Sequence, residues 1–169
     1  IYKQMSGVEV RDQERGVEYL KTLAFVDPER IGVYGWSYGG YMALMAMMQA
    51  PEAFKAGVSG APVTDWRLYD THYTERYMST PAENPEGYEF SNVISHVEQL
   101  RGPLLVVHGM ADDNVLLNHS TLLFRAMQKK DISFDSMMYP GETHGFRDPD
   151  IRLHHARLIM RFFDQHLME

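Results

Sequence analysis

Ser37 stands in a setting that could make its hydroxyl a nucleophile. It is the central residue of Gly35-Trp36-Ser37-Tyr38-Gly39, which matches the pattern Gly-x-Ser-x-Gly. In a nucleophile elbow a strand turns sharply into a helix at such a serine, and we expect both glycines to leave room for neighbouring backbone. The hydroxyl is then exposed beside a helix N-terminus, whose N–H groups can stabilise an oxyanion. The motif predicts acyl-transfer chemistry, provided that a base and an acid accompany it.

The segments on either side of the motif fit a strand-to-helix turn. A buried strand is expected over 31–35, after the turn residues Asp27 and Pro28. The stretch 41–48 is apolar on every side, as in a fully buried helix. The alternative is a structural turn whose serine only makes local hydrogen bonds. The base and acid candidates further along the chain weigh against that alternative.

A catalytic serine needs a histidine base, and the base needs an acid that orients it. In α/β-hydrolases these partners follow the serine in the order acid, histidine, each on a loop after a strand. Here strands are expected at 104–108 and 134–139; Asp112 and Asp113 follow the first, and His144 follows the second between glycines. His144 is therefore the candidate base. The residues alone leave open which of the two adjacent aspartates orients it.

The other histidines fit the role of base less well. Six lie in predicted helices or in segments that no strand precedes: His72, His96, His119, His154, His155 and His166. His108 follows a strand but precedes the acid loop, which favours a structural role. The chain contains neither His-x-x-x-His nor His-Glu-x-x-His spacing, so we assign it no metal and no cofactor.

Strands and helices alternate over most of the chain. The strands are expected at 31–35, 56–60, 104–108 and 134–139, and the helices at 10–26, 40–50, 118–130 and 149–167. Between Thr64 and His96 the pattern changes to short, tyrosine-rich segments, which we expect to shape a pocket above the strand C-termini. The pattern predicts an α/β fold with a mostly parallel sheet and helices on both faces.

Length and composition narrow the classes of function. At 169 residues the chain suits one domain, and its net charge of −7, without a Lys/Arg cluster, argues against nucleic acid and anionic membranes as partners. No apolar stretch reaches transmembrane length, and no signal peptide is visible. The absence of cysteine excludes disulfides and thiol chemistry, and it leaves both a periplasmic and a cytoplasmic location open.

Three blocks of sequence together resemble the dipeptidyl peptidase IV branch of the prolyl oligopeptidase family. They are GWSYGGY at 35–41, YDTHYTERYM at 69–78 and HGMADDNV at 108–115. The three blocks in this order are far more specific than the serine motif, and the likeness extends over nearly the whole chain. The resemblance implies an α/β-hydrolase fold in which Ser37 is the nucleophile, Asp112 the acid and His144 the base.

The resemblance also implies a substrate site. The backbone N–H of Tyr38 matches an oxyanion donor, and Asn114 matches a position that binds a substrate carbonyl. The family's apolar pocket maps onto five side chains: Val63, Trp66, Tyr69, Tyr73 and Val115.

Four aromatic residues in this region recur at spacings of three and four. They are Trp66, Tyr69, Tyr73 and Tyr77, and the spacing predicts one helix that carries all of them on one face. Tyr69 and Tyr73 suit a pocket, because flat aromatic walls fit a proline ring and tolerate alanine. For Trp66 and Tyr77, packing in the core is the alternative.

The resemblance bears on the extent of the domain as well. In the family, an N-terminal β-propeller precedes the hydrolase domain and supplies acidic residues that bind the substrate's amino terminus. Neither propeller blades nor the first strands of an α/β-hydrolase sheet are recognisable here. Residues 1–169 are therefore interpreted as the C-terminal part of a peptidase catalytic domain. On their own we expect them to be inactive or poorly stable, because the strand at 31–35 would lack a neighbour.

The function implied is that of a serine exopeptidase acting on peptides. It would release dipeptides from peptide N-termini after proline or alanine, through an acyl-enzyme. Tripeptidyl release is an alternative, as are an acylaminoacyl peptidase, an oligopeptidase or a carboxylesterase with the same triad. A catalytically silent α/β-hydrolase module used for association is the alternative from another class. A homodimer through the hydrolase domain is a further expectation from the family.

Overall fold

The computed structural model describes residues 1–168, and its centre is one parallel sheet. Four strands lie in sequence order: β1 (Gly32–Trp36), β2 (Ala56–Gly60), β3 (Leu104–Gly109) and β4 (Asp135–Tyr139). The helices around it are α1 (Gly7–Lys21), α2 (Tyr38–Gln49), α3 (Thr71–Met78), α4 (Pro85–Phe90), α5 (Asn118–Lys129) and α6 (Pro149–Leu167), with two 3-10 segments, η1 (Trp66–Leu68) and η2 (Val93–Gln99). This is the α/β arrangement that the sequence predicts.

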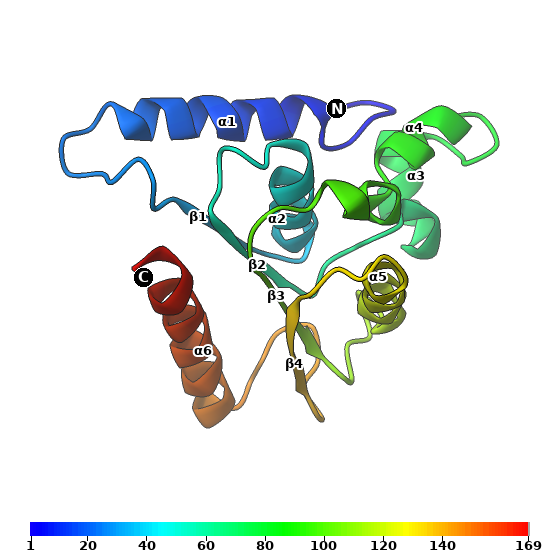
Figure 1. Ribbon diagram of the computed structural model, residues 1–169. Coiled ribbons are helices and arrows are strands. Elements are labelled where there is room, and N and C mark those ends of the chain that lie inside the picture. Colours follow the sequence, from blue (N-terminus) through cyan, green and yellow to red (C-terminus); the bar gives the residue numbers. More distant parts are fainter. Residues whose placement is uncertain (169) are drawn as a thin grey trace.

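Helices cover both faces of the sheet (Figure 1). α2 and α5 lie on one face and α6 on the other, while α1 runs across the top of the molecule next to α2. Residues along β3 show why, because successive side chains of a strand point to opposite faces. Leu104 and Val106 belong to the apolar cluster around α2, whereas Leu105 and Val107 belong to the cluster under α6. A strand apolar at every position therefore requires a helix on each side.

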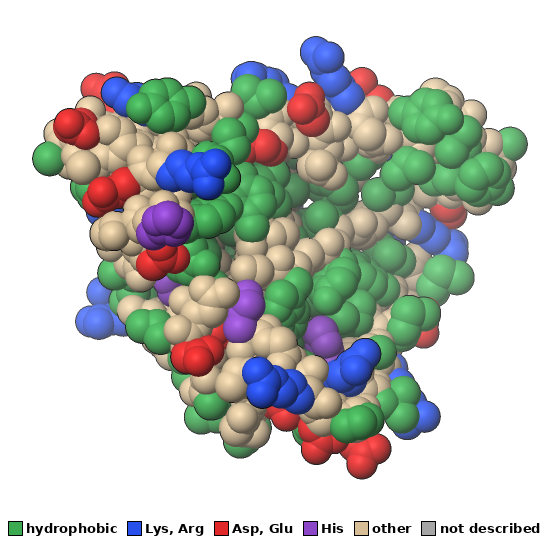
Figure 2. All heavy atoms as spheres, turned by 180° about the vertical axis from the view of Figure 1, so that it is seen from behind, with side chains coloured by type: hydrophobic (Ala, Val, Ile, Leu, Met, Phe, Trp, Pro, Cys, Tyr) green, Lys and Arg blue, Asp and Glu red, His purple; other side chains and the backbone are tan. Residues whose placement is uncertain are grey.

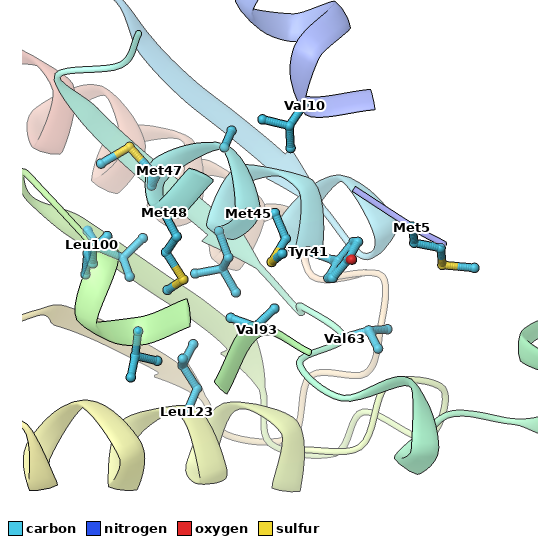
Figure 3. Packing of buried hydrophobic residues seen from close by; sticks show 14 of the residues in the cluster. Met5, Val10, Tyr41, Met45, Met47, Met48, Val63, Val93, Leu100 and Leu123 are labelled. Carbon is cyan, nitrogen blue, oxygen red and sulfur yellow. The ribbon is translucent and has the colours of Figure 1, made fainter. Parts of the chain in front are cut away.

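The larger apolar cluster is built around α2. This helix contacts the sheet below it, α1 on one side and η2 on the other, so it buries residues around its whole circumference. Met45 and Met48 point from it toward Val93 of η2, with Leu123 of α5 beyond (Figure 3). Fully burying one such side chain contributes about 1.5–3 kcal/mol. α2 is thus a core helix of 12 residues, and no helix within 1–168 is both long and apolar enough to cross a membrane.

Element boundaries depart from the sequence prediction by one or two residues at most elements, and most clearly at the first helix. The first helix, expected over 10–26, spans Gly7–Lys21 instead. Residues 22–26 form short turns, and Phe25 is 85% exposed. The apolar side chain of Phe25 therefore does not pack in the core, although its spacing continues the helical pattern. Figure 2 shows hydrophobic side chains at the surface around this end of α1. The first strand is shifted by one residue and ends at Trp36, directly before Ser37.

β1 is one edge of the sheet. Among the described residues it pairs only with β2, and Tyr34 in its middle is 49% exposed. An edge strand presents unpaired N–H and C=O groups to a further strand or to another chain.

Candidate active site

Ser37 occupies a strained turn between β1 and α2. Its backbone has φ 60° and ψ −119°, a conformation rare for a residue with a side chain. The turn is held by a 2.8 Å hydrogen bond from the Ser37 N–H to the carbonyl of Gly60, at the end of the neighbouring strand. Such strain of about 1–3 kcal/mol persists only where surrounding structure enforces it, typically at functional sites. The turn is the predicted nucleophile elbow.

The glycines of the elbow have different roles. A Cβ on Gly35 would lie 2.1 Å from the carbonyl oxygen of Gly39, and one on Gly40 would lie 2.3 Å from that of Gly60. A Cβ on Gly39 would meet nothing within 4 Å. The expectation that Gly35 and Gly39 both leave room for backbone is therefore right for Gly35 and wrong for Gly39. The third tight position is Gly40, where α2 packs directly on β2.

His144 connects the serine to an aspartate. Its Nε2 lies 2.9 Å from Ser37 Oγ, and its Nδ1 lies 2.8 Å from Asp112 Oδ2. The three side chains come from the loops after β1, β3 and β4, which meet at the carboxyl edge of the sheet. With the Nδ1–H donated to the carboxylate, Nε2 is left to accept the hydroxyl proton. The arrangement can carry out nucleophilic acyl transfer.

The two adjacent aspartates are in different environments. The side chain of Asp112 is fully buried, and its Oδ1 accepts the backbone N–H groups of Asn114 and Val115 at 3.0 and 2.9 Å. Burial raises the pKa of Asp112, but the ring N–H groups of His108 and His144 and the backbone N–H of Asn114 outweigh it and hold the pKa well below its usual range. Asp113 is exposed. The structure thus brings Asp112, and not Asp113, to His144.

Trp36 ties the serine turn to the loop of the base. Its indole N–H donates to the carbonyl of His144 at 2.9 Å, and its ring packs edge-on against Phe146. The acid and base loops are joined as well, by a 2.9 Å bond from the Ala111 N–H to the carbonyl of Glu142. Sequence reasoning missed Trp36, whose only signal was its place directly before the serine.

Tyr38 adds a backbone donor and an anchored ring. As the first residue of α2 it has no acceptor for its N–H within the helix. Its hydroxyl donates to Glu9 of α1 at 2.8 Å, and its ring lies 5.9 Å from that of Trp66. Burial, and then the bond to Glu9, raise the pKa of Tyr38. The hydroxyl therefore stays protonated and anchors α1 to the site. The sequence held no signal for Glu9.

The four aromatic residues do not share one helix, contrary to the sequence prediction. Trp66 lies in η1, and Tyr69 follows in extended conformation with φ −96° and ψ 163°. α3 begins only at Thr71, where Asp70 caps it by accepting the Tyr73 N–H at 2.9 Å. An aspartate at this position is a common helix-start signal. This signal predicts a helix that begins at Thr71, as observed, and not one that runs through from Trp66.

The aromatic rings nevertheless gather into one cluster. Trp66 stacks on Tyr73 with 5.9 Å between ring centroids and 17° between planes, and Tyr69 meets Tyr73 edge-on at 5.5 Å. Trp66 is 1% exposed, whereas Tyr69 and Tyr73 are half-buried. The remaining pocket candidates, Val63 and Val115, are fully buried in the same apolar cluster as Trp66.

Asn114 is held by this aromatic cluster. The Tyr69 hydroxyl donates to its Oδ1 at 2.7 Å. Because the amide oxygen is occupied, the two amide N–H groups of the exposed Asn114 remain free to donate. The side chain can therefore bind a carbonyl oxygen close to the triad.

Comparison with known proteins identifies the family to which this chain is related. The whole chain, residues 1–169, matches the prolyl oligopeptidase family. The chain belongs to that family. It is 38% identical over 168 residues to dipeptidyl peptidase 8 of Homo sapiens, covering 97% of this chain and 19% of that protein. It is 36% identical over 168 residues to dipeptidyl peptidase 4 of Bos taurus, covering 98% of this chain and 22% of that protein.

The structural match to this prolyl oligopeptidase family is equally extensive. Dipeptidyl peptidase 4 of Porphyromonas gingivalis superposes with a TM-score of 0.94 at 41% identity, over 98% of this chain and 24% of that one. These relatives confirm the dipeptidyl peptidase IV branch, and the superposition identifies the sheet as part of its hydrolase fold. The chain spans about a fifth to a quarter of the length of the relatives that it matches.

Proposed function

We propose that this chain carries the catalytic triad of a serine exopeptidase that releases dipeptides from peptide N-termini after proline or alanine. The observation that supports this most directly is the continuous chain of contacts from Ser37 through His144 to Asp112, at 2.9 and 2.8 Å. The dipeptidyl peptidase relatives support the class of reaction and the size of the product.

In the proposed acylation step, Ser37 Oγ attacks the carbonyl carbon of the second substrate residue. The hydroxyl proton passes to His144 Nε2, and the buried Asp112 carboxylate stabilises the imidazolium through the Nδ1–H. The N–H of Tyr38 donates to the developing oxyanion. The carbon–nitrogen bond then breaks, and Nε2 returns its proton to the leaving amine. An acyl-enzyme on Ser37 remains.

Hydrolysis of the acyl-enzyme repeats these steps with water. His144 takes a proton from the water as its oxygen attacks the ester carbon, and then returns that proton to Ser37 Oγ as the dipeptide leaves. Tyr69 and Tyr73 are half-buried, and their accessible ring surface would contact a proline ring or an alanine methyl group. Asn114, with its amide N–H groups free, would bind the carbonyl of the substrate's first residue.

Substrate comparison tests the proposal in the protein at the full length that its gene encodes. Wild type and Ser37→Ala are assayed with Gly-Pro-p-nitroanilide, N-acetyl-Ala-p-nitroanilide and p-nitrophenyl butyrate. We expect preferential cleavage of the first substrate. We expect Ser37→Ala to reduce kcat by at least about 10⁴-fold, the scale seen when a catalytic serine is removed.

The other outcomes separate the alternatives. Preferential turnover of the blocked substrate indicates an acylaminoacyl peptidase, and turnover of the ester alone indicates a carboxylesterase. If a fluorophosphonate fails to label wild-type protein at Ser37, the module is catalytically silent and the proposal is wrong.

We also propose that residues 1–169 alone lack activity, because the outer edge of β1 has no partner strand among the described residues. Full turnover of a dipeptide anilide by this segment in isolation would contradict that. The expected homodimer is supported only by exposed apolar side chains of α6, such as Leu153 and Met160. Sedimentation of the full-length protein tests it.

A further inference from the structure

His108 is a buried titratable side chain that the mechanism above does not use. It lies in β3, and its side chain is completely inaccessible to solvent. Its Nδ1 lies 2.7 Å from the hydroxyl of Ser120 in α5, and its Nε2 lies 2.8 Å from the carbonyl of Val115. Nε2 also lies 3.2 Å from Oδ2 of Asp112, the same oxygen that faces the candidate base.

The surroundings of the ring place a hydrogen on Nε2. The Val115 carbonyl and the Asp112 carboxylate are acceptors only, so the nitrogen that faces both must carry the N–H. Nδ1 is then free to accept the hydroxyl proton of Ser120. The two acceptors at Nε2 thereby select the tautomer, and the Ser120 hydroxyl, which can donate or accept, is compatible with it as a donor to Nδ1.

This donor completes the environment of the carboxylate. Oδ1 of Asp112 accepts two backbone N–H groups, and Oδ2 faces the ring N–H groups of His108 and His144 at 3.2 and 2.8 Å. The carboxylate therefore accepts three hydrogen bonds, and the His108 N–H, whose hydrogen bond is to the Val115 carbonyl, adds a longer electrostatic contact at Oδ2. Its negative charge is also shared between two imidazole rings.

We propose that His108 is a positioning residue for the reaction: its Nε2–H holds Asp112 Oδ2 in line with His144 Nδ1 and limits how strongly Asp112 attracts the protonated base. The inference deepens the proposed function and rests on it. A purely structural role needs only the bonds to Ser120 and Val115, which join β3 to the following loop and to α5. The contact with Asp112 distinguishes the two roles.

Three other titratable groups, His119, Asp65 and Tyr69, act on this pair or on its neighbours. His119 of α5 lies near His108; burial, and then His108, lower the pKa of His119 to about 4. Asp65 faces His119, and Tyr69 faces Asp112 from the aromatic cluster. None of these groups contacts Asp112 Oδ2 as His108 and His144 do, within the described structure.

Two substitutions of His108 separate positioning from packing. His108→Gln can keep an N–H where Nε2 stands, whereas His108→Leu fills similar volume without a donor. In the full-length protein, we expect His108→Leu to lower kcat on Gly-Pro-p-nitroanilide about tenfold with KM unchanged, the rate equivalent of one hydrogen bond to a charged group. We expect His108→Gln to stay within about threefold of wild type on the same scale.

The pH profile gives a readout that a packing role would not change. Without the His108 donor, Oδ2 attracts the protonated base more strongly, so the acidic limb of log kcat/KM against pH moves to higher pH in His108→Leu. It stays in place in His108→Gln. The matched control is His119→Gln, which alters a neighbouring buried histidine. We expect it to lower the unfolding temperature and leave the acidic limb unchanged.

A spectroscopic measurement keeps this inference separate from the proposed function. The low-field proton NMR signal of the His144 Nδ1–H, identified by its loss in His144→Gln, needs no turnover. We expect it to shift in His108→Leu and not in His108→Gln. Wild-type kcat, an unmoved acidic limb and an unmoved signal in His108→Leu would overturn the role of His108, whatever its stability. If the wild-type protein has no peptidase activity, the proposed function is wrong. The NMR comparison then still tests whether His108 positions Asp112.

Discussion

The two sides of Ser37 are built in different ways. On the side of the base, hydrogen bonds hold each group: Asp112 is contacted by backbone and ring N–H groups, and Trp36 holds the backbone of His144. On the aromatic side, rings pack against rings, and buried polar atoms of Tyr41 and Trp66 have no hydrogen-bond partner among residues 1–168. The difference indicates that directional hydrogen bonds fix the contacts among Ser37, His144 and Asp112, whereas the aromatic side is held mainly by apolar contact.

This contrast predicts which kinetic parameter each side controls. Directional bonds at the base affect the transition state, and their loss lowers kcat. Ring contacts stabilise the bound substrate and the transition state equally, so their loss raises KM and leaves kcat nearly unchanged.

The largest effect is expected from Asp112→Asn. A neutral amide cannot stabilise the imidazolium and favours the wrong tautomer of His144, so we expect kcat to fall by about 10³–10⁴-fold. Steady-state kinetics on a dipeptide anilide measures this. The matched control is Asp113→Asn at the exposed neighbouring position, which should stay close to wild type. Equal losses in both variants would mean that the acid has been misassigned.

Gly35→Ala tests whether the turn at Ser37 depends on the close backbone packing found on the side of the base. Its Cβ would lie 2.1 Å from the Gly39 carbonyl oxygen, which must move. We expect a loss of about 3 kcal/mol in the free energy of unfolding, at the upper end for overpacking. Gly39→Ala adds a methyl group to open space in α2 and should be neutral or slightly stabilising. Urea denaturation of both variants gives the comparison, and similar stabilities would contradict it.

Tyr73→Ala tests the aromatic side. The substitution removes a half-buried ring that touches Trp66, Tyr69 and Tyr77. We expect KM to rise about tenfold with kcat nearly unchanged, since one partly buried aromatic contact is worth about 1–2 kcal/mol. Tyr73→Phe keeps the ring and serves as the control. A fall in kcat with unchanged KM would place Tyr73 in the proton-transfer apparatus.

A smaller effect is expected on stability in acid. The pKa of Asp112 is lower in the folded chain than in the unfolded one, so its contribution is present above about pH 4 and is lost as pH falls further. Wild type should therefore lose part of its unfolding free energy below that pH, and Asp112→Asn should lose less. Chemical denaturation at several pH values checks this. Parallel curves for the two proteins would show that Asp112 makes no such contribution.

Most helices and strands could be predicted from the sequence, because the local pattern of apolar residues depends on local secondary structure. The apolar runs around 56–60 and 104–108 predicted two strands well. The first helix was predicted too long, because the apolar residues near Phe25 continue the helical spacing without reaching the core. The prediction of one aromatic helix is wrong for a similar reason: the spacing of three and four continues across Asp70, which caps the start of α3.

The sequence by itself determined the identities and the order of the candidate reacting groups. A serine between glycines, an aspartate pair and a glycine-flanked histidine each follow an apolar run. Residue positions alone left Asp112 and Asp113 open, and the family resemblance favoured Asp112. The tertiary structure brings Asp112 to His144, and only it placed His108 beside the acid and Trp36 on the base loop. The physical reason is that these contacts join loops from different strands. Their distances depend on sheet register and on buried packing across the chain, and no local spacing of residues encodes them.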